Sequence, residues 1–218
     1  MQPDLFDLIV SNNLDGLRTA LTANPELANE GVSLNIDGKI NSAKGHPLHR
    51  VCDAVFANKI SDNHAIEIAK MLLAYGADID GFMVQSDRNT PLIAAASLHA
   101  EQLGLFYIEK GADIFYAPPG DGGTALHWAA YCGEDQLVEK LIEKGANINQ
   151  QDTSYQSTPC GWAIRVLESG GTSNLHHQLT CIKLLIKAGT DKSLLYPGSL
   201  QYLQDAAKND PELKTLLE

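Results

Sequence analysis

The chain has 218 residues, of which 44% are hydrophobic and 20% are charged, and its formal net charge at pH 7 is −11. The hydrophobic share suffices for a packed core, which excludes a disordered chain. The excess of 27 acidic over 16 basic residues argues against nucleic acids and anionic membrane surfaces as partners, because binding to phosphate groups depends on Lys and Arg.

The N-terminus does not resemble a secretory signal peptide. Asp4 and Asp7 stand where such a peptide needs positive charge, and the apolar run at residues 8–10 is far shorter than the ~7–15 residues that an apolar signal region has. No window approaches the ~18 apolar residues that would cross a bilayer, and the four cysteines are too few for a disulfide framework. We therefore expect a cytoplasmic protein, with secretion by a route that needs no cleavable signal left open.

Two short sequence markers recur along the chain. Tetrapeptides of the type Thr-Pro-Leu-His occupy residues 46–49, 90–93, 124–127 and 158–161. Turns of the type Gly-Ala-Asp follow at residues 76–78, 111–113, 145–147 and 189–191. The last three tetrapeptides are 34 residues apart, and the first and last units carry insertions at residues 53–63 and 169–175. Thr before Pro starts a helix and glycine ends one, so each unit is predicted to be two helices and an extended loop that bury their apolar face only by stacking.

This pattern resembles the ankyrin repeat, and the chain is similar to small ankyrin repeat proteins of the bacterial type. The segment 120–151 matches almost throughout, whereas the preceding segment has Ile93 in place of the motif histidine and Arg88 in place of a glycine. The resemblance implies an all-α solenoid of about five helix-turn-helix repeats with hairpin loops and a C-terminal helical cap, in a single domain over residues 1–218. Its expected parts are a degenerate first repeat at 4–29, a long loop at 30–45, repeats at 46–80, 85–117, 120–151 and 154–191, and the cap at 198–218.

Two groups of histidine and cysteine residues raise the possibility of a metal site: His46, His49 and Cys52, and His176, His177 and Cys181. His49 stands at the motif position, and the resemblance implies that it bonds to backbone between neighbouring repeats. The second group lies near an insertion and is interpreted as part of a solvated loop. Structural zinc favours closely spaced pairs of ligands, and no Cys-x-x-Cys is present. We therefore expect no bound metal.

Signatures of catalysis are also absent from the sequence. The glycine-rich stretch at residues 120–123 is not followed by Lys-Ser or Lys-Thr, so turn chemistry explains it better than phosphate binding. Cys132 and Cys160 lie close in sequence to Trp128 and Trp162 on helices that should be packed, which favours inert thiols. We expect no enzyme activity and no cofactor, with a metal- or thiol-dependent activity as the alternative.

The residues that we predict to bind a partner lie on two surfaces that ankyrin-like folds present. On the first helices, facing the concave groove, they are Asp53, Ser97, Tyr131 and Arg165. On the hairpin tips they are Asp87, Asn89, Asp121, Tyr155 and Gln156. Tyr and Arg are enriched among interface residues that contribute most to affinity, although exposure without any partner is the alternative. Trp128 and Trp162, 34 residues apart, are expected to be core or half-buried.

These observations predict a non-catalytic scaffold for protein–protein interaction. Acidic residues at the tips favour a partner with a basic surface; they are Asp80, Asp87, Asp121 and Asp152. The two insertions are expected to lie near opposite ends of the stack and to bracket the partner. A second hypothesis is an immunity-type inhibitor that blocks a toxin or an enzyme.

Overall fold

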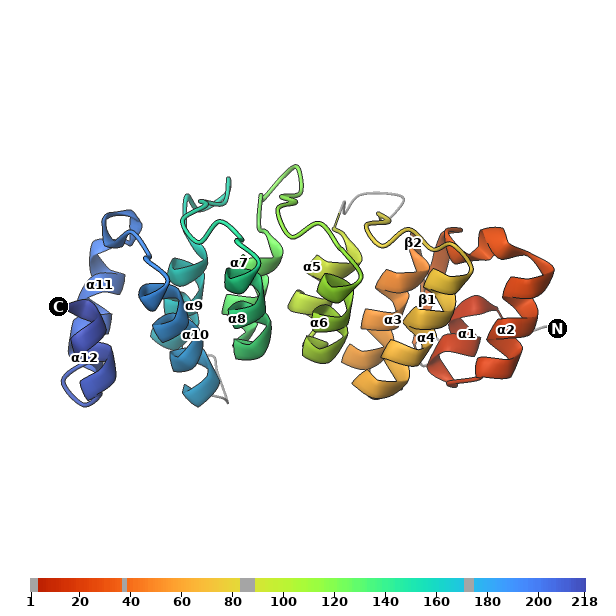
Figure 1. The fold of residues 1–218 in the computed structure, drawn as a ribbon, viewed down its shortest axis with the longest axis horizontal. Helices are drawn as coiled ribbons and strands as arrows, with labels where there is room; N and C mark the ends of the chain where they lie inside the picture. Colours follow the sequence, from red (N-terminus) through yellow and green to blue (C-terminus); the bar gives the residue numbers. More distant parts are fainter. Residues whose placement is uncertain (1–3, 37–38, 83–88, 171–174) are drawn as a thin grey trace. The chain divides into compact units, whose positions relative to one another are not determined.

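The computed structural model describes residues 4–36, 39–82, 89–170 and 175–218, with only the backbone described at residues 35, 36 and 39–43. The chain divides into two compact units, residues 1–113 and 114–218. Each unit is described by itself below (Figure 1).

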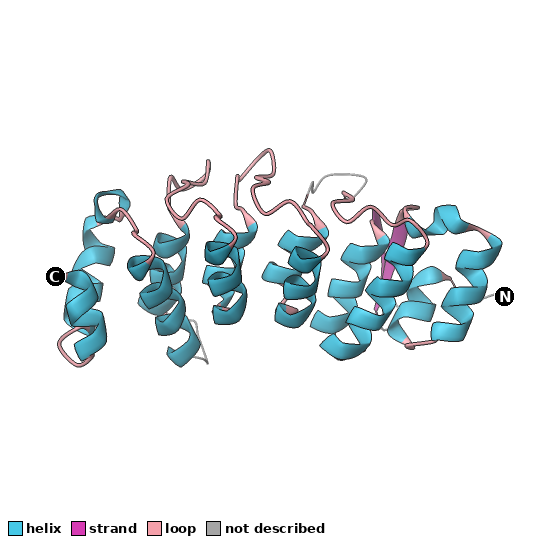
Figure 2. Cartoon of the chain, in the orientation of Figure 1, coloured by secondary structure: helices cyan, strands magenta, loops and turns pink. Residues whose placement is uncertain are grey.

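The first unit consists of helices that pack in pairs and of one short hairpin. Its elements are α1 (Leu5–Val10), α2 (Leu14–Ala23), the 3-10 helix η1 (Pro25–Ala28), β1 (Val32–Ile36), β2 (Lys39–Gly45), α3 (Pro47–Phe56), α4 (Asp62–Ala74), α5 (Pro91–Ser97) and α6 (Glu101–Glu109). Helix α3 packs between α1 and α5, while α4 contacts α2 and α6. The first helices and the second helices of successive pairs therefore form two layers within this unit (Figure 2).

The segment between η1 and α3 corrects one expectation. We predicted a long loop over residues 30–45, but β1 and β2 pair as an antiparallel hairpin with an irregularity between Ser33 and Leu34. Strand β1 contacts α1 and α3. The buried Arg50 of α3 donates a hydrogen bond from Nε to the carbonyl oxygen of Val32 at 2.9 Å, which links the hairpin to the helical layer.

The second unit continues the same alternation of helices. Its elements are α7 (Ala125–Cys132), α8 (Asp135–Glu143), α9 (Pro159–Glu168), α10 (Leu175–Lys187), the 3-10 helix η2 (Lys192–Leu194), α11 (Pro197–Ala206) and α12 (Pro211–Leu217). Helix α9 packs between α7 and α11, and α10 packs against α8 and α12. The predicted fold class, helical ankyrin-type repeats, is confirmed.

Helix ends follow from the two recurring markers. The hydroxyl groups of Thr90, Thr124 and Thr158 accept hydrogen bonds from backbone N–H groups of the first helical turn, which satisfies donors that have no partner within the helix. At the other marker, Gly145 follows α8 with a φ of +88°, a conformation that costs glycine little. His46 replaces the threonine before α3, and its Nδ1 accepts from Leu48 N–H at 3.3 Å.

The first helices of the two units with insertions, α3 and α9, are longer than the first helices α5 and α7 of the other two repeats. Helices α3 and α9 each have ten residues, compared with seven in α5 and eight in α7. Residues 171–174 of the second insertion lie outside the described residues. The core lies between the helical layers, where Leu126, Leu137 and Leu141 are fully or almost fully buried, and each such side chain contributes about 1.5–3 kcal/mol.

Candidate functional site

The second unit carries a groove of about 770 Å³ beside the first helices of its repeats. It is lined by α7, the loop before α9, α9 itself and the start of α11. We call it the aromatic groove, after the aromatic and charged side chains that define it: Trp128, Tyr131, Tyr155, Trp162, Arg165, Glu168 and Tyr196.

Three rings in this groove pack edge to face. The ring centroids of Trp128 and Trp162 are 5.1 Å apart with their planes at 85°. Tyr131 lies 6.0 Å from each of them at interplanar angles of 78° and 79°. Edge-to-face packing brings the positive edge of one ring to the negative face of another. Both tryptophans are half-buried, as the sequence analysis expected, while Tyr131 is 45% exposed.

A buried carboxylate holds the groove in shape. Asp152 Oδ2 accepts hydrogen bonds from Trp162 Nε1 at 2.9 Å and from Ser157 N–H at 3.1 Å. Its Oδ1 accepts from the backbone N–H of Ser154 at 2.9 Å and of Tyr155 at 2.6 Å. Burial raises the pKa of the Asp152 carboxyl, but the hydrogen bonds from Trp162 and the backbone more than offset this, so the pKa lies below its ordinary value. The ionised carboxylate thus fixes both the indole of Trp162 and the loop that carries Tyr155.

This position of Asp152 corrects another expectation. We counted it among the acidic residues of the exposed tips, but its side chain is buried. The loop turns the carboxylate inward because four N–H donors converge on it, and so it adds no charge to the accessible tip.

The motif histidine of α7 supports the same loop. His127 Nδ1 accepts from Thr124 N–H at 3.2 Å, which leaves Nε2–H to donate to the carbonyl oxygen of Ser157 at 3.2 Å. Burial lowers the pKa of His127, so the ring is neutral at pH 7. The imidazole also packs edge to face against Trp162, with centroids 5.2 Å apart. His127 therefore bonds to the backbone of the next repeat, as the resemblance implied for the motif position.

Three of the five predicted contact residues in this unit line the aromatic groove. They are Tyr131, Tyr155, which is 67% exposed, and Arg165, whose side chain is 77% exposed with Nη1 3.4 Å from Glu168 Oε2. Asp121 and Gln156 do not line it.

Those two residues make local contacts instead. The Asp121 carboxylate accepts from Gly123 N–H at 3.1 Å, and the Gln156 amide donates to Thr153 O at 3.3 Å. Sequence reasoning missed Glu168 and Tyr196. Tyr196 is 53% exposed and its hydroxyl donates to the carbonyl oxygen of Tyr155. An exposed tyrosine directly before the proline that starts the cap helix is the signal that could have indicated it.

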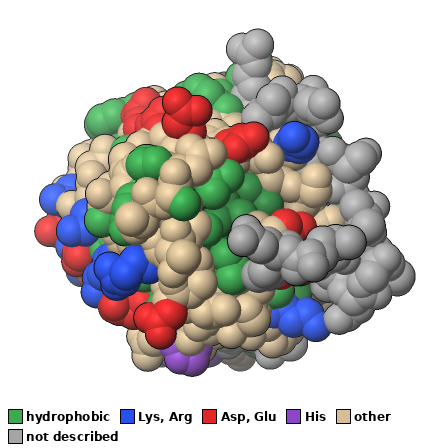
Figure 3. Space-filling view, turned by 90° about the vertical axis from the view of Figure 1, so that its right-hand side faces the viewer, with side chains coloured by type: hydrophobic (Ala, Val, Ile, Leu, Met, Phe, Trp, Pro, Cys, Tyr) green, Lys and Arg blue, Asp and Glu red, His purple; other side chains and the backbone are tan. Residues whose placement is uncertain are grey.

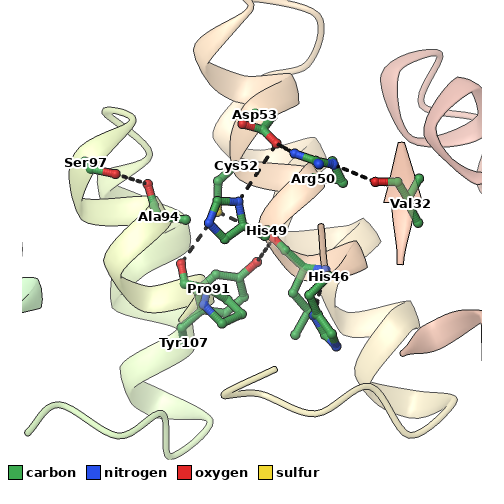
Figure 4. Close-up of polar contacts among 11 residues, drawn as sticks. Val32, His46, His49, Arg50, Cys52, Asp53, Pro91, Ala94, Ser97 and Tyr107 are labelled. Carbon is green, nitrogen blue, oxygen red and sulfur yellow. Dashed lines mark hydrogen bonds and ion pairs between the residues drawn. The ribbon is translucent and has the colours of Figure 1, made fainter. Parts of the chain in front are cut away.

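Asp53 and Ser97, two of the predicted contact residues of the first unit, form hydrogen bonds within the chain (Figure 4). Asp53 accepts from Arg50 Nη1 at 2.6 Å, and Ser97 donates to the carbonyl oxygen of Ala94 at 3.2 Å. Burial raises the pKa of Asp53, but the nearby His49 and Arg50 more than offset this and lower it. Asn89 is half-buried; Asp87 lies outside the described residues.

The first histidine and cysteine group is structural. His46 caps α3, and Cys52 is fully buried with Sγ 3.5 Å from Leu48 O. Our expectation for His49 was wrong: within the described part of the chain its buried ring makes no hydrogen bond to backbone, and its Nδ1 lies 3.9 Å from Asp53 Oδ2. The neighbouring repeats are linked here by Tyr107, whose hydroxyl donates a hydrogen bond to the carbonyl oxygen of Leu48 at 3.0 Å (Figure 4).

The second histidine and cysteine group is helical. We expected a solvated loop at His176, His177 and Cys181, but all three lie in α10. The helix forms because its buried face packs on α8 and α9, and His177 Nδ1 lies 2.9 Å from Asp135 Oδ2. Among the residues with a described structure, no three His, Cys, Asp or Glu side chains form a group that could hold a metal ion.

The thiols are packed as expected. Burial raises the pKa of Cys52 well above its ordinary value and raises that of Cys132 and of Cys160 to about 12. A thiol with such a pKa is protonated at pH 7 and is a poor nucleophile.

The charges on the surface are mixed where they can be seen. From the side of the first unit that carries the N-terminus, acidic and basic side chains alternate with hydrophobic ones rather than forming one acidic patch (Figure 3). Within the described part of the chain, no helix has the length and apolar character that crossing a membrane requires.

Comparison with known proteins agrees with the geometry. The family model described as "Ankyrin repeats (3 copies)" matches residues 56–152 and 100–196, together more than half of the chain. A solved ankyrin repeat domain from Acinetobacter baumannii AYE superimposes with a TM-score of 0.68 at 23% identity, covering 98% of this chain and 95% of that one.

Curated relatives match shorter segments. Palmitoyltransferase ZDHHC13 of Mus musculus is 33% identical over 114 residues, and Palmitoyltransferase ZDHHC17 of Danio rerio is 34% identical over 101 residues. These segments are 48% and 44% of this chain but only 17% and 14% of the two relatives. The repeated markers, the helix pairs and the family match lead to one conclusion: the chain belongs to the ankyrin repeat family.

Proposed function

We propose that this chain is a non-catalytic scaffold that binds a protein partner, and that the aromatic groove is its main contact surface. The observation that carries the proposal is the set of exposed aromatic rings at Tyr131, Tyr155 and Tyr196 beside two half-buried tryptophans. Ankyrin repeats bind protein partners, and exposed aromatic residues around a concavity are typical of interaction sites.

The groove is suited to binding because it is already formed. Asp152 and His127 hold Trp162 and the loop of Tyr155 through hydrogen bonds. Because these side chains are already fixed, little conformational entropy is lost when a partner binds, and the affinity is correspondingly higher.

The chemistry of the chain points away from other functions. Burial raises the pKa of the Cys52, Cys132 and Cys160 thiols, which are therefore protonated at pH 7, and the Cys181 side chain is buried. The two palmitoyltransferases share only a small part of their length with this chain, so we propose no acyl transfer. The net charge of −11 favours a partner with a basic surface over nucleic acid or an anionic membrane, and we propose that the chain works in the cytoplasm without a cofactor.

Affinity capture with groove variants tests this function. The full-length chain is immobilised as wild type, as Tyr131→Ala and as Leu175→Ala, and proteins captured from the source cells are quantified by mass spectrometry. Leu175 is an exposed apolar residue of α10 that does not line the groove, so it controls for a general loss of apolar surface.

The expected result is a protein captured by the wild type and by Leu175→Ala but depleted about 30-fold by Tyr131→Ala, as for a contact residue that contributes about 2 kcal/mol. Equal capture by all three chains would show that the groove is not the contact surface. If the captured protein is a toxin or an enzyme that loses activity in the complex, the scaffold acts as an immunity-type inhibitor.

A further inference from the structure

We propose that the aromatic groove recognises a basic segment of its partner, with an arginine or lysine side chain of that segment lying against the rings of Tyr131 and Trp162. This inference rests on the function proposed above and specifies the chemistry of the bound segment.

The first support is the arrangement of the rings. Trp128, Tyr131 and Trp162 all line the groove and pack edge to face with one another. The face of an aromatic ring carries partial negative charge and attracts a cation within about 6 Å of the centroid, with indole the strongest of the aromatic side chains. The lining of the groove thus brings two indoles and a phenol together at one place.

The second support is the buried carboxylate behind Trp162. The indole N–H of Trp162 donates to Asp152 Oδ2 at 2.9 Å. Donation to an ionised acceptor shifts electron density into the indole, which makes its face a better acceptor for a cation. Because Asp152 is buried, a ligand cannot pair with it directly, but the charge acts through a medium of low dielectric, where its attraction is screened less than in water.

The third support is the charge at the edge of the groove. Glu168 lines the groove with a side chain that is 20% exposed, and Arg165 lies 3.4 Å from it with a side chain that is 77% exposed. The carboxylates of Asp152 and Glu168 are thus opposed by the single exposed guanidinium among the residues that line the groove, that of Arg165. An incoming cation can take the place of Arg165 beside Glu168, whereas the same carboxylate would repel an acidic segment.

This arrangement assigns opposite roles to two neighbours on α9. Glu168 attracts the basic segment, whereas Arg165 competes with it. The sequence analysis placed Arg165 among the residues that contact the partner, so the sign of its effect distinguishes a groove for cations from a groove for acidic segments.

Peptide selection tests the proposal without knowledge of the partner. Random 12-residue peptides displayed on phage are selected on the full-length chain and depleted on Trp162→Leu. The expected pool is enriched in sequences that contain Arg or Lys relative to the starting library. A pool of acidic or neutral peptides, or no enrichment that depends on Trp162, overturns the proposal.

A synthetic pair of peptides then isolates the charge. The best selected peptide and its counterpart with citrulline in place of Arg, or with acetyl-lysine in place of Lys, differ only in losing the cation. Binding is followed by the two indole N–H signals in NMR spectra, because Trp128 and Trp162 are the only tryptophans of the chain and both line the groove. We expect the neutral peptide to bind about 5- to 30-fold more weakly, the range that cation–π contacts give. Equal affinities refute the proposal.

Charge variants of the protein provide a second, independent test of the proposal. Glu168→Gln should weaken binding of the basic peptide, and Arg165→Gln should strengthen it. The matched control is Glu139→Gln, because Glu139 is an exposed acid of α8 away from the groove and its removal changes the net charge equally. If Glu139→Gln weakens binding as much as Glu168→Gln, the attraction is a general effect of the acidic chain and the assignment to the groove is wrong.

The two proposals fail in different ways. A captured protein that depends on Tyr131 but binds through a neutral or acidic segment would overturn the inference about the cation and leave the scaffold function standing. If neither the captured proteins nor the peptides depend on the groove, both proposals are wrong.

Discussion

Replacing Asp152 with alanine should destabilise the second unit more than any change of an accessible acid. The carboxylate accepts four N–H donors. Those of Ser154 and Tyr155 belong to exposed residues and can turn to water. Those of Ser157, which is buried, and of Trp162 Nε1 would lose their acceptor inside the protein. A hydrogen bond to a charged group contributes about 1.5–3 kcal/mol, so the two together predict a loss of about 3–6 kcal/mol in the free energy of unfolding.

The assay is urea unfolding followed by tryptophan fluorescence, which reports on the second unit because both tryptophans lie there. Asp121→Ala is the matched control. The half-buried Asp121 carboxylate accepts a hydrogen bond from the N–H group of Gly123, so its removal should lower the free energy of unfolding by about 1 kcal/mol. A cost for Asp152→Ala no larger than that of Asp121→Ala would refute the role of Asp152 in holding the groove.

The pH dependence of the same variant has a definite sign. The pKa of Asp152 lies below its ordinary value of 3.8 in the folded chain. The unfolded state therefore binds the proton more readily, and the contribution of the carboxylate is complete above the ordinary value. It is lost as the pH falls through the folded pKa. The difference in unfolding free energy between wild type and Asp152→Ala should thus shrink below about pH 4, and a difference that grows on acidification would contradict the account.

Three further predictions concern the groove, the first unit and the core. In Gly123→Ala, an added Cβ would lie 3.0 Å from Trp162 Cη2 and 3.3 Å from Trp128 Nε1, so the rings should move, with a change in tryptophan emission and a loss of about 1–3 kcal/mol; unchanged emission and stability would show that the rings tolerate the methyl group. Burial lowers the pKa of His46 from 6.5 to about 4, so the neutral ring is favoured in the folded state and the first unit should lose up to about 3 kcal/mol as the pH falls from 6.5 to 4; hydrogen exchange in α3 measures this, and constant protection would refute it. Leu141→Ala, at a fully buried position of α8, should cost about 2–5 kcal/mol in urea unfolding, whereas a cost under 1 kcal/mol would show that the site collapses around the change.

The helix pairs could be predicted because their signals are local. A threonine before a helix and a glycine after it specify the ends through bonds within four residues, as at Thr158 and Gly145. The hairpin at residues 32–45 was missed although Asp37-Gly38 stands in the sequence between its two runs, a pair typical of tight hairpin turns. Its attachment to α3 through Arg50 depends on a contact 18 residues away, which spacing along the chain does not reveal.

The start of α10 was missed for a similar reason. Gln178 donates from its amide nitrogen to the carbonyl oxygens of Ala130 at 2.6 Å and Ala163 at 3.2 Å. These bonds stabilise the N-terminal part of α10 in the packed structure, although its polar residues alone are typical of a loop.

The candidate site was predictable in part. Tyr131 and Arg165 followed from their places on the first helices of the repeats, and Tyr155 followed from its place on a hairpin tip. The role of Asp152 did not follow, because an acidic residue in a loop looks the same in sequence whether its carboxylate meets water or four N–H donors. The contact of Tyr196 with Tyr155 joins residues 41 positions apart, which spacing along the chain does not reveal.

The central claim is that the aromatic groove of the second unit binds the partner. Isothermal titration of the captured partner against the wild type and Trp162→Leu tests it most directly, with thermal unfolding confirming that the variant is folded. The account predicts a Kd at least about 30-fold higher for Trp162→Leu, corresponding to 2 kcal/mol or more. An unchanged Kd in a folded variant would contradict it.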